Sequence, residues 1–145
     1  MKKIFLLASM AISFFTFAQI KIDDSIKPTL IGKVSQGQVT LEKLDDQYSI
    51  CYNDAKFLVV DSFKCFSFTE KNNDLQNLYQ LIIKGFEQVP KDNIRLDLPN
   101  DKIELRFTKN LGIVSMQFHH FDKNSGVYGF STYLTKKQIN KLFGK

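Results

Sequence analysis

The sequence predicts an α+β fold with an antiparallel sheet of about six to eight strands, one central amphipathic helix and one short C-terminal helix. Three observations support this. Short runs of alternating apolar and polar residues are joined by turns, a stretch with helical periodicity separates two groups of such runs, and a helix-start signature lies near the C-terminus. The 145 residues are 43% hydrophobic and 24% charged, which suits one domain with a core and excludes collagen-like, low-complexity and disulfide-dense classes.

The N-terminal residues 1–18 are typical of a cleaved signal peptide. Lys2 and Lys3 precede an uncharged apolar stretch of residues 4–18, and small residues stand three positions and one position before Gln19. This stretch is shorter than the ~20 residues that a membrane-spanning helix needs, so an uncleaved anchor is the less favoured alternative. We therefore expect an exported protein, periplasmic or secreted and typical of small bacterial exported proteins, whose mature chain is a single domain of residues 19–145.

The charge of the mature chain argues against two classes of partner. Without Lys2 and Lys3, 18 basic residues face 15 acidic ones, a net charge of +3. This charge is too small to indicate nucleic acid binding, and the aromatic strands lack the interleaved basic residues of a base-stacking surface. We expect no nucleic acid partner and no stable membrane insertion after signal removal.

The first group of predicted strands covers residues 30–68. Ser35, Gln36 and Gly37 indicate a hairpin turn between two strands over residues 30–44, and a third strand follows from Tyr48. Residues 53–54 indicate a turn into a return strand at residues 57–60, and residues 63–68 form another extended segment. Because all the connections are short, we expect antiparallel pairing.

Two cysteines, Cys51 and Cys65, enter an oxidising compartment if the chain is exported, so a disulfide is possible. A return strand that ran straight to Cys65 would place the sulfurs about 30 Å apart at ~3.3 Å per residue. A disulfide requires the chain to fold back near Asp61 and Ser62. The pattern therefore favours two free, largely buried thiols, with the Cys51–Cys65 disulfide as the alternative.

The central helix follows from apolar residues that recur every three or four positions. One apolar face is predicted, with Asn72 or Asn73 as the N-cap, Asp74 in the first turn and Pro90 beyond the end. The residues of this face are Leu75, Leu78, Ile82, Phe86 and Val89.

A hairpin with a two-residue loop at Pro99 and Asn100 is predicted next. This register places Arg95 opposite Glu104 and Asp97 opposite Lys102, whereas a longer loop would oppose like charges. Further strands are predicted over residues 113–121 and 127–134.

The C-terminal helix begins at a capping box formed by Thr135 and Gln138. Its inward face comprises Ile139, Leu142 and Phe143, which we expect to cover one face of the sheet together with the central helix. Its polar side carries Lys136, Lys137 and Lys141. These lysines are weak candidates for binding an acidic partner, and a solvated surface is the favoured interpretation.

Catalytic motifs are absent: the sequence has no glycine-rich phosphate loop, G-x-S-x-G, H-E-x-x-H or C-x-x-C. The two histidines, His119 and His120, are consecutive in a predicted strand and therefore point to opposite faces. His120 shares a face with Asp122, which makes this pair a weak catalytic candidate. The favoured interpretation places His120 at the rim of the core and His119 in solvent.

Residues 122–126 carry oxygen ligands that resemble half a calcium loop at most, so a turn is favoured and no metal or cofactor is expected.

The leading functional expectation is a small exported, non-enzymatic binding or interaction domain for an unknown protein or small-molecule partner. One alternative is a small hydrolase or metal-dependent enzyme that uses His120 and Asp122. A second alternative is an envelope-associated stress or maintenance protein that acts through the basic C-terminal helix.

Overall fold

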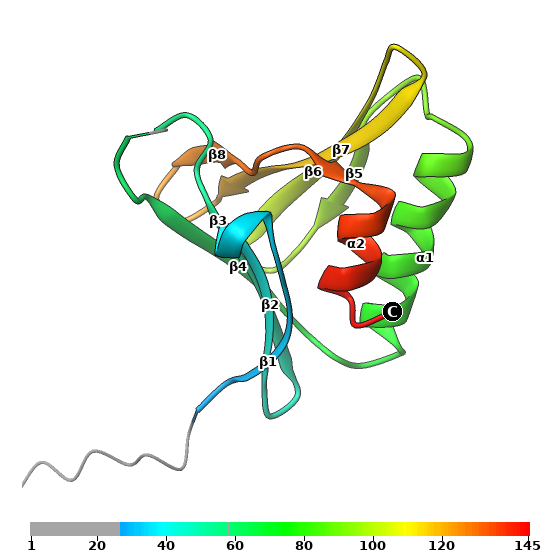
Figure 1. Ribbon diagram of the computed structural model, residues 1–145. Helices are drawn as coiled ribbons and strands as arrows, with labels where there is room; N and C mark the ends of the chain where they lie inside the picture. Colours follow the sequence, from blue (N-terminus) through cyan, green and yellow to red (C-terminus); the bar gives the residue numbers. More distant parts are fainter. Residues whose placement is uncertain (1–26, 58) are drawn as a thin grey trace, which may run out of the picture.

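The computed structural model describes residues 27–57 and 59–145, and Figure 1 shows their arrangement. The predicted signal peptide, residues 1–18, lies outside the described residues. Within them the α+β fold is confirmed, but the strands form two antiparallel sheets of four and five strands instead of one.

Sheet A is a meander of four strands in the order β1-β2-β3-β4. A short 3-10 turn, Ser35–Gly37, joins the first two strands at the predicted hairpin. The strands are β1 (Thr29–Val34), β2 (Val39–Leu44), β3 (Gln47–Asn53) and β4 (Phe63–Thr69).

Sheet B has the order β5-β6-β7-β8, and β9 also pairs with β7. The predicted hairpin register is confirmed, with Arg95 opposite Glu104 and Asp97 opposite Lys102. The predicted strand over residues 127–134 is interrupted and forms β8 and β9. The strands are β5 (Ile94–Asp97), β6 (Asp101–Asn110), β7 (Ile113–Asp122), β8 (Tyr128–Phe130) and β9 (Leu134–Thr135).

The two helices lie beside each other next to the sheets (Figure 1). In α1 (Asp74–Glu87), Asn73 is the N-cap residue, but its backbone is left-handed and its side chain accepts no capping hydrogen bond. The carboxylates of Glu70 and Asp74 instead accept hydrogen bonds from nearby main-chain N–H groups. The predicted capping box of α2 (Lys136–Leu142) is confirmed. No helix in the described ranges has the length and apolar character needed to cross a bilayer.

The main core lies where β4 crosses sheet B. Near the start of β4, the Lys64 ammonium donates to the Tyr128 carbonyl of β8. The Phe66 ring lies 5.6 Å from those of Phe118 and His120 in β7, and Phe68 lies near β5 across a cleft. Of the predicted helix residues, Leu78, Ile82, Phe86, Ile139, Leu142 and Phe143 are buried, Leu75 is partly buried and Val89 is exposed.

The far edge of sheet A is covered by α2. A Cβ atom added to Gly32 in β1 would lie 2.2 Å from the carbonyl oxygen of Leu142, so only glycine permits this approach. The β1–β2 ladder is also irregular between Leu30 and Gly32. Both features close the β1 edge to further pairing.

The preference for free cysteines is wrong, because Cys51 and Cys65 form a disulfide. The predicted return strand at residues 57–60 is also wrong. The chain instead makes an excursion after Asn53 and returns at Phe63, so Cys51 and Cys65 become direct cross-strand partners with Cα atoms 4.1 Å apart. The bridge therefore joins neighbouring strands, within the distance range a disulfide needs.

Candidate functional site

Two regions qualify as candidate sites: a buried group of polar side chains between the sheets and an apolar cleft beside α1. The first is the inter-sheet polar cluster, which comprises Tyr52, Asp54, Lys64, Asp101 and His120. The second is the α1–β4–β5 cleft.

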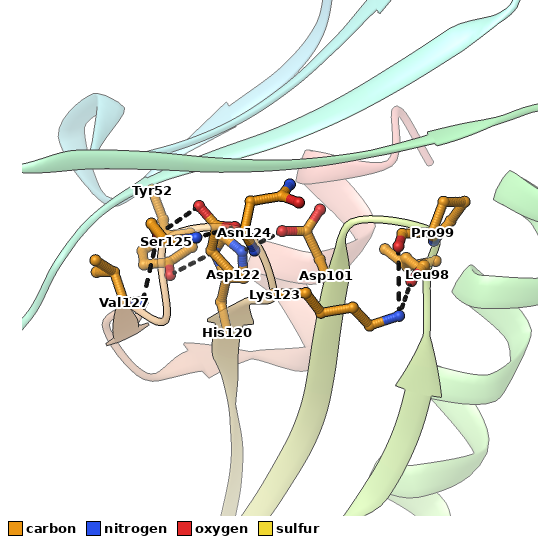
Figure 2. Close-up of polar contacts among 10 residues, drawn as sticks. All are labelled: Tyr52, Leu98, Pro99, Asp101, His120, Asp122, Lys123, Asn124, Ser125 and Val127. Atoms are coloured by element: carbon orange, nitrogen blue, oxygen red, sulfur yellow. Dashed lines mark hydrogen bonds and ion pairs between the residues drawn. The ribbon is translucent and has the colours of Figure 1, made fainter.

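His120 is the centre of the inter-sheet polar cluster (Figure 2). Its Nε2 atom lies 2.7 Å from Asp101 Oδ1, and its Nδ1 atom lies 3.0 Å from the hydroxyl of Tyr52. A carboxylate oxygen accepts, so Nε2–H donates to Asp101, and in the neutral imidazole Nδ1 then accepts from the Tyr52 hydroxyl. The chain Tyr52–His120–Asp101 links β3 of sheet A to β7 and β6 of sheet B.

This chain of hydrogen bonds is closed to solvent. Tyr52 is fully buried and His120 is 4% exposed. Burial, followed by the nearby carboxylates of Asp54 and Asp101, raises the pKa of Tyr52 above its usual range. A hydroxyl that is closed to solvent and has a raised pKa is a poor nucleophile, so the geometry resembles a catalytic triad without its accessible reacting atom.

Asp54 and Lys64 form the second inter-sheet link. The buried Asp54 carboxylate accepts hydrogen bonds from the Lys64 ammonium and from the N–H groups of Lys56 and Phe130. Burial raises the pKa of Asp54, but these hydrogen bonds and the Lys64 charge outweigh it, and the net effect lowers the pKa. A Cβ atom on Gly129 would lie 2.6 Å from the Lys64 nitrogen and 2.8 Å from Asp54 Oδ2, so a larger residue there would displace this pair.

Asp122 does not hydrogen-bond to His120. Its carboxylate accepts from the hydroxyl and N–H of Ser125 and from the N–H of Asn124 (Figure 2), and these hydrogen bonds lower its pKa. Residues 122–126 therefore form a closed turn. The orienting carboxylate of His120 is Asp101, which faces Asp122 across the β6–β7 ladder.

The expectation that His119 lies in solvent is wrong, because its residue is 7% exposed. The side chains of β8 cover this outer face of β7: the His119 ring stacks on Phe130 and contacts Tyr128. His119 also hydrogen-bonds to the hydroxyl of Tyr128 and to Gln117 Oε1. The alternation of β7 correctly places the two histidines on opposite faces, but both faces are covered.

The lysines of α2 lie on the surface as expected. Lys136 pairs with Glu87 of α1 at 3.1 Å, and Lys137 and Lys141 are exposed. A mixed surface of this kind gives a weak local field.

The α1–β4–β5 cleft has a volume of about 690 Å³, within the range of small-molecule sites. Its apolar lining comes from all three elements. Phe66 and Leu78 are buried, whereas the other apolar lining residues are only partly buried in the free protein: Phe68, Leu81, Leu96 and Leu98.

The cleft forms because three elements diverge. β4 ends at Thr69 and the chain crosses directly to α1, while β5 is only four residues long and pairs with the first half of β6. The edges of the two sheets therefore leave a gap beneath α1 that no side chain of the described residues fills.

The charges at the cleft rim cancel. Arg95 pairs with Glu104 at 2.9 Å, and Asp97 pairs with Lys123 at 2.6 Å. Hydrogen bonding from Lys123 and its positive charge lower the pKa of Asp97. Lys71 and Asp74, which also line the rim, have opposite charges. The cleft is thus apolar inside with a neutral mouth.

Sequence reasoning missed Tyr52, Asp54, Lys64 and Asp101 as members of a polar cluster. Asp101 could have been predicted from alternation, because it shares the inward face of its strand with Ile103 and Leu105. A carboxylate on a buried face requires a hydrogen-bond partner. No sequence pattern indicated the pairing of Asp54 with Lys64, since it depends on the path of the chain between β3 and β4.

Within residues 27–57 and 59–145, no three His, Cys, Asp or Glu side chains are grouped as a metal site. No protein-family model, curated protein or solved structure matches this chain.

Proposed function

We propose that this protein is an exported, non-enzymatic binding domain that takes an apolar ligand in the α1–β4–β5 cleft. The observation that carries the proposal is the cleft itself, in which partly buried leucines and phenylalanines surround about 690 Å³. An apolar occupant would remove these side chains from water, which contributes roughly 25 cal/mol per Å² of buried apolar surface.

The export part of the proposal rests on two features. Residues 1–18 have the pattern of a cleaved signal peptide, and the Cys51–Cys65 disulfide is consistent with an oxidising compartment. The intact mass of the protein recovered from its native host tests it. We expect a chain that begins at Gln19 and lacks two hydrogens relative to the reduced form, whereas a mass that includes residues 1–18 would contradict cleavage.

The catalytic alternative has less support. His120 is buried between Tyr52 and Asp101, and the Asp122 carboxylate is engaged in its own turn. The alternative based on the basic C-terminal helix also has less support, because Lys136 is already paired with Glu87.

Binding in the cleft can be tested with phenylnaphthylamine, an uncharged apolar fluorophore. Asn77 is exposed on α1 and lines the cleft, so Asn77→Trp would fill the site without disturbing the core. Gln80→Trp is the matched control, because Gln80 is exposed on the same helix but does not line the cleft.

We expect saturable fluorescence enhancement with the parent protein and with Gln80→Trp, and an affinity about tenfold lower or worse for Asn77→Trp. Both variants should keep the parent melting temperature within a few degrees, because surface substitutions cost about 0.5 kcal/mol or less. Equal binding by all three proteins, or no saturable binding by the parent, would overturn the proposal.

A further inference from the structure

Strand β4 has one unpaired edge. Within residues 27–57 and 59–145 its ladder partner is β3 alone, and the main-chain hydrogen bonds Glu70 N–H to Asp46 and Asp54 N–H to Ser62 flank that ladder. In an antiparallel pair, hydrogen-bonded and non-hydrogen-bonded positions alternate, so these two bonds define which residues face outward. The outward residues at the centre and end of β4 are Cys65, Ser67 and Thr69.

The short Cα–Cα distance of 4.1 Å between Cys51 and Cys65 confirms this assignment, because non-hydrogen-bonded pairs are the closer ones. Among the described residues, no hydrogen bond reaches the outward main-chain groups of Cys65, Ser67 and Thr69. These residues are exposed or partly exposed. The β4 edge therefore presents a row of free N–H donors and C=O acceptors.

The other sheet edges in the described ranges are blunted. β1 is irregular and covered by α2, β5 has four residues, and β8 has three residues and is joined to Ala55 through Phe130. β4 has seven residues without proline or glycine, and its single charge, on Lys64, is bound to Asp54. A long, uncharged, regular edge lacks the usual protection against pairing with another strand.

This edge adjoins the α1–β4–β5 cleft, since Thr69 lines it together with Phe66 and Phe68. In a strand added to β4, alternate side chains would share the face of Phe66 and Phe68 and point toward the cleft. The paired charges of the rim, Arg95 with Glu104 and Asp97 with Lys123, match an uncharged occupant. An occupant that offers main-chain donors and acceptors, alternate apolar side chains and no charge is an extended polypeptide.

We infer that the ligand of the cleft is an uncharged extended peptide segment of another protein, which adds to sheet A as a fifth strand along β4. This inference rests on the proposed function and specifies its ligand. The disulfide supports the arrangement, because it joins β4 to β3 at Cys65 and keeps the edge ordered before the peptide arrives.

The probe is a seven-residue peptide of alternating threonine and valine, blocked at both ends. Every strand pair of sheet A is antiparallel, and we assign the same direction to the added strand. In an antiparallel pair, the peptide residues that bond to the outward groups of β4 share a face with Ser67, and those between them share a face with Phe66. With valine directed to the cleft, the threonine N–H groups face β4. N-methylation of three N–H groups of one residue type therefore distinguishes strand addition from simple apolar binding.

We expect saturable binding of the parent peptide, retention of binding when the valines are methylated, and loss of binding by about tenfold or more when the threonines are methylated. Equal effects of both methylation patterns would overturn the inference. So would an absence of peptide binding while phenylnaphthylamine still binds, a result that leaves the proposed function intact.

Variants of Ser67 provide a second measurement. Ser67→Pro removes an outward N–H without deleting a β3–β4 ladder bond, and Ser67→Ala controls for the lost side-chain bond to Ser49. We expect the peptide to bind Ser67→Ala normally and Ser67→Pro about tenfold more weakly, with phenylnaphthylamine binding unchanged in both. If light scattering instead shows a dimer that Ser67→Pro dissociates, a second copy occupies the edge and the inference is wrong.

Discussion

The inter-sheet polar cluster and the α1–β4–β5 cleft both lie against β4, but they differ in how far their groups are engaged within the protein. In the cluster, Asp54, Asp101 and His120 are buried and each has hydrogen-bond partners within the chain. In the cleft, Phe68 and Leu96 remain partly exposed, and no described residue hydrogen-bonds to the outward main-chain groups of the β4 edge. The cluster therefore holds the two sheets together, and the cleft is the region left for a partner.

We therefore expect substitutions in the cluster to reduce stability without changing ligand affinity. Substitutions in the cleft should reduce ligand affinity without changing stability. The largest loss is expected for Asp54→Ala. This change removes the partner of Lys64 and the acceptor for two main-chain N–H groups, so the free energy of unfolding should fall by about 3 kcal/mol. Urea unfolding measures the change, and Asp61→Ala is the control, since Asp61 is exposed and makes only a 3.4 Å contact. Equal losses for both variants would contradict a special role for Asp54.

The disulfide comes next in size. Cys51 and Cys65 are 14 residues apart, and closing a loop of that length stabilises a protein by about 3 kcal/mol in the chain-entropy description. Replacing both cysteines with alanine should lower the free energy of unfolding by a comparable or slightly smaller amount, measured without reductant. Reductant should destabilise the parent protein and leave the double variant unchanged; a double variant as stable as the oxidised parent would show that the bridge is dispensable.

Tyr52→Phe should have a smaller effect. It removes one hydroxyl and leaves His120 Nδ1 without its donor, at a cost of about 1–2 kcal/mol. Phenylnaphthylamine affinity should stay at the parent value, because Tyr52 does not line the cleft. A variant that keeps its stability but loses ligand binding would reverse the assignment of the two regions.

The smallest effect concerns pH. Burial, followed by the positive charge of Arg106, lowers the pKa of His119 below its ordinary value. The unfolded chain therefore takes up a proton near pH 6.5 that the folded protein resists, so stability is lost as the pH falls through about 6.5. The slope should not exceed about 1.4 kcal/mol per pH unit, and His119→Gln should flatten it between pH 7.5 and 5.5. An identical slope in the variant would show that another group is responsible.

Local pattern was sufficient for most of the fold. The helical periodicity of residues 75–86, the capping box at Thr135 and the charge pairing of Arg95 with Glu104 are short-range signals, and the structure confirms all three. The failures concern contacts that depend on the path of the chain. The excursion between β3 and β4 contains apolar residues that resemble a strand, and this misassignment also hid the disulfide and the Asp54–Lys64 pair.

The candidate site was less predictable than the fold for the same reason. His120 could be placed on a buried face from alternation, but its partners Tyr52 and Asp101 lie 68 and 19 residues away. The cleft arises from the divergence of α1, β4 and β5, and no single segment encodes that divergence.

The most direct test of the central claim is a map of amide ¹H–¹⁵N chemical-shift changes as the threonine–valine peptide is added to the protein. We expect the changes to concentrate on the β4 edge at Cys65, Ser67 and Thr69, and on the facing residues of α1 and β5. His119 and His120 should shift little. Changes centred on the inter-sheet polar cluster, with β4 and α1 unaffected, would contradict it.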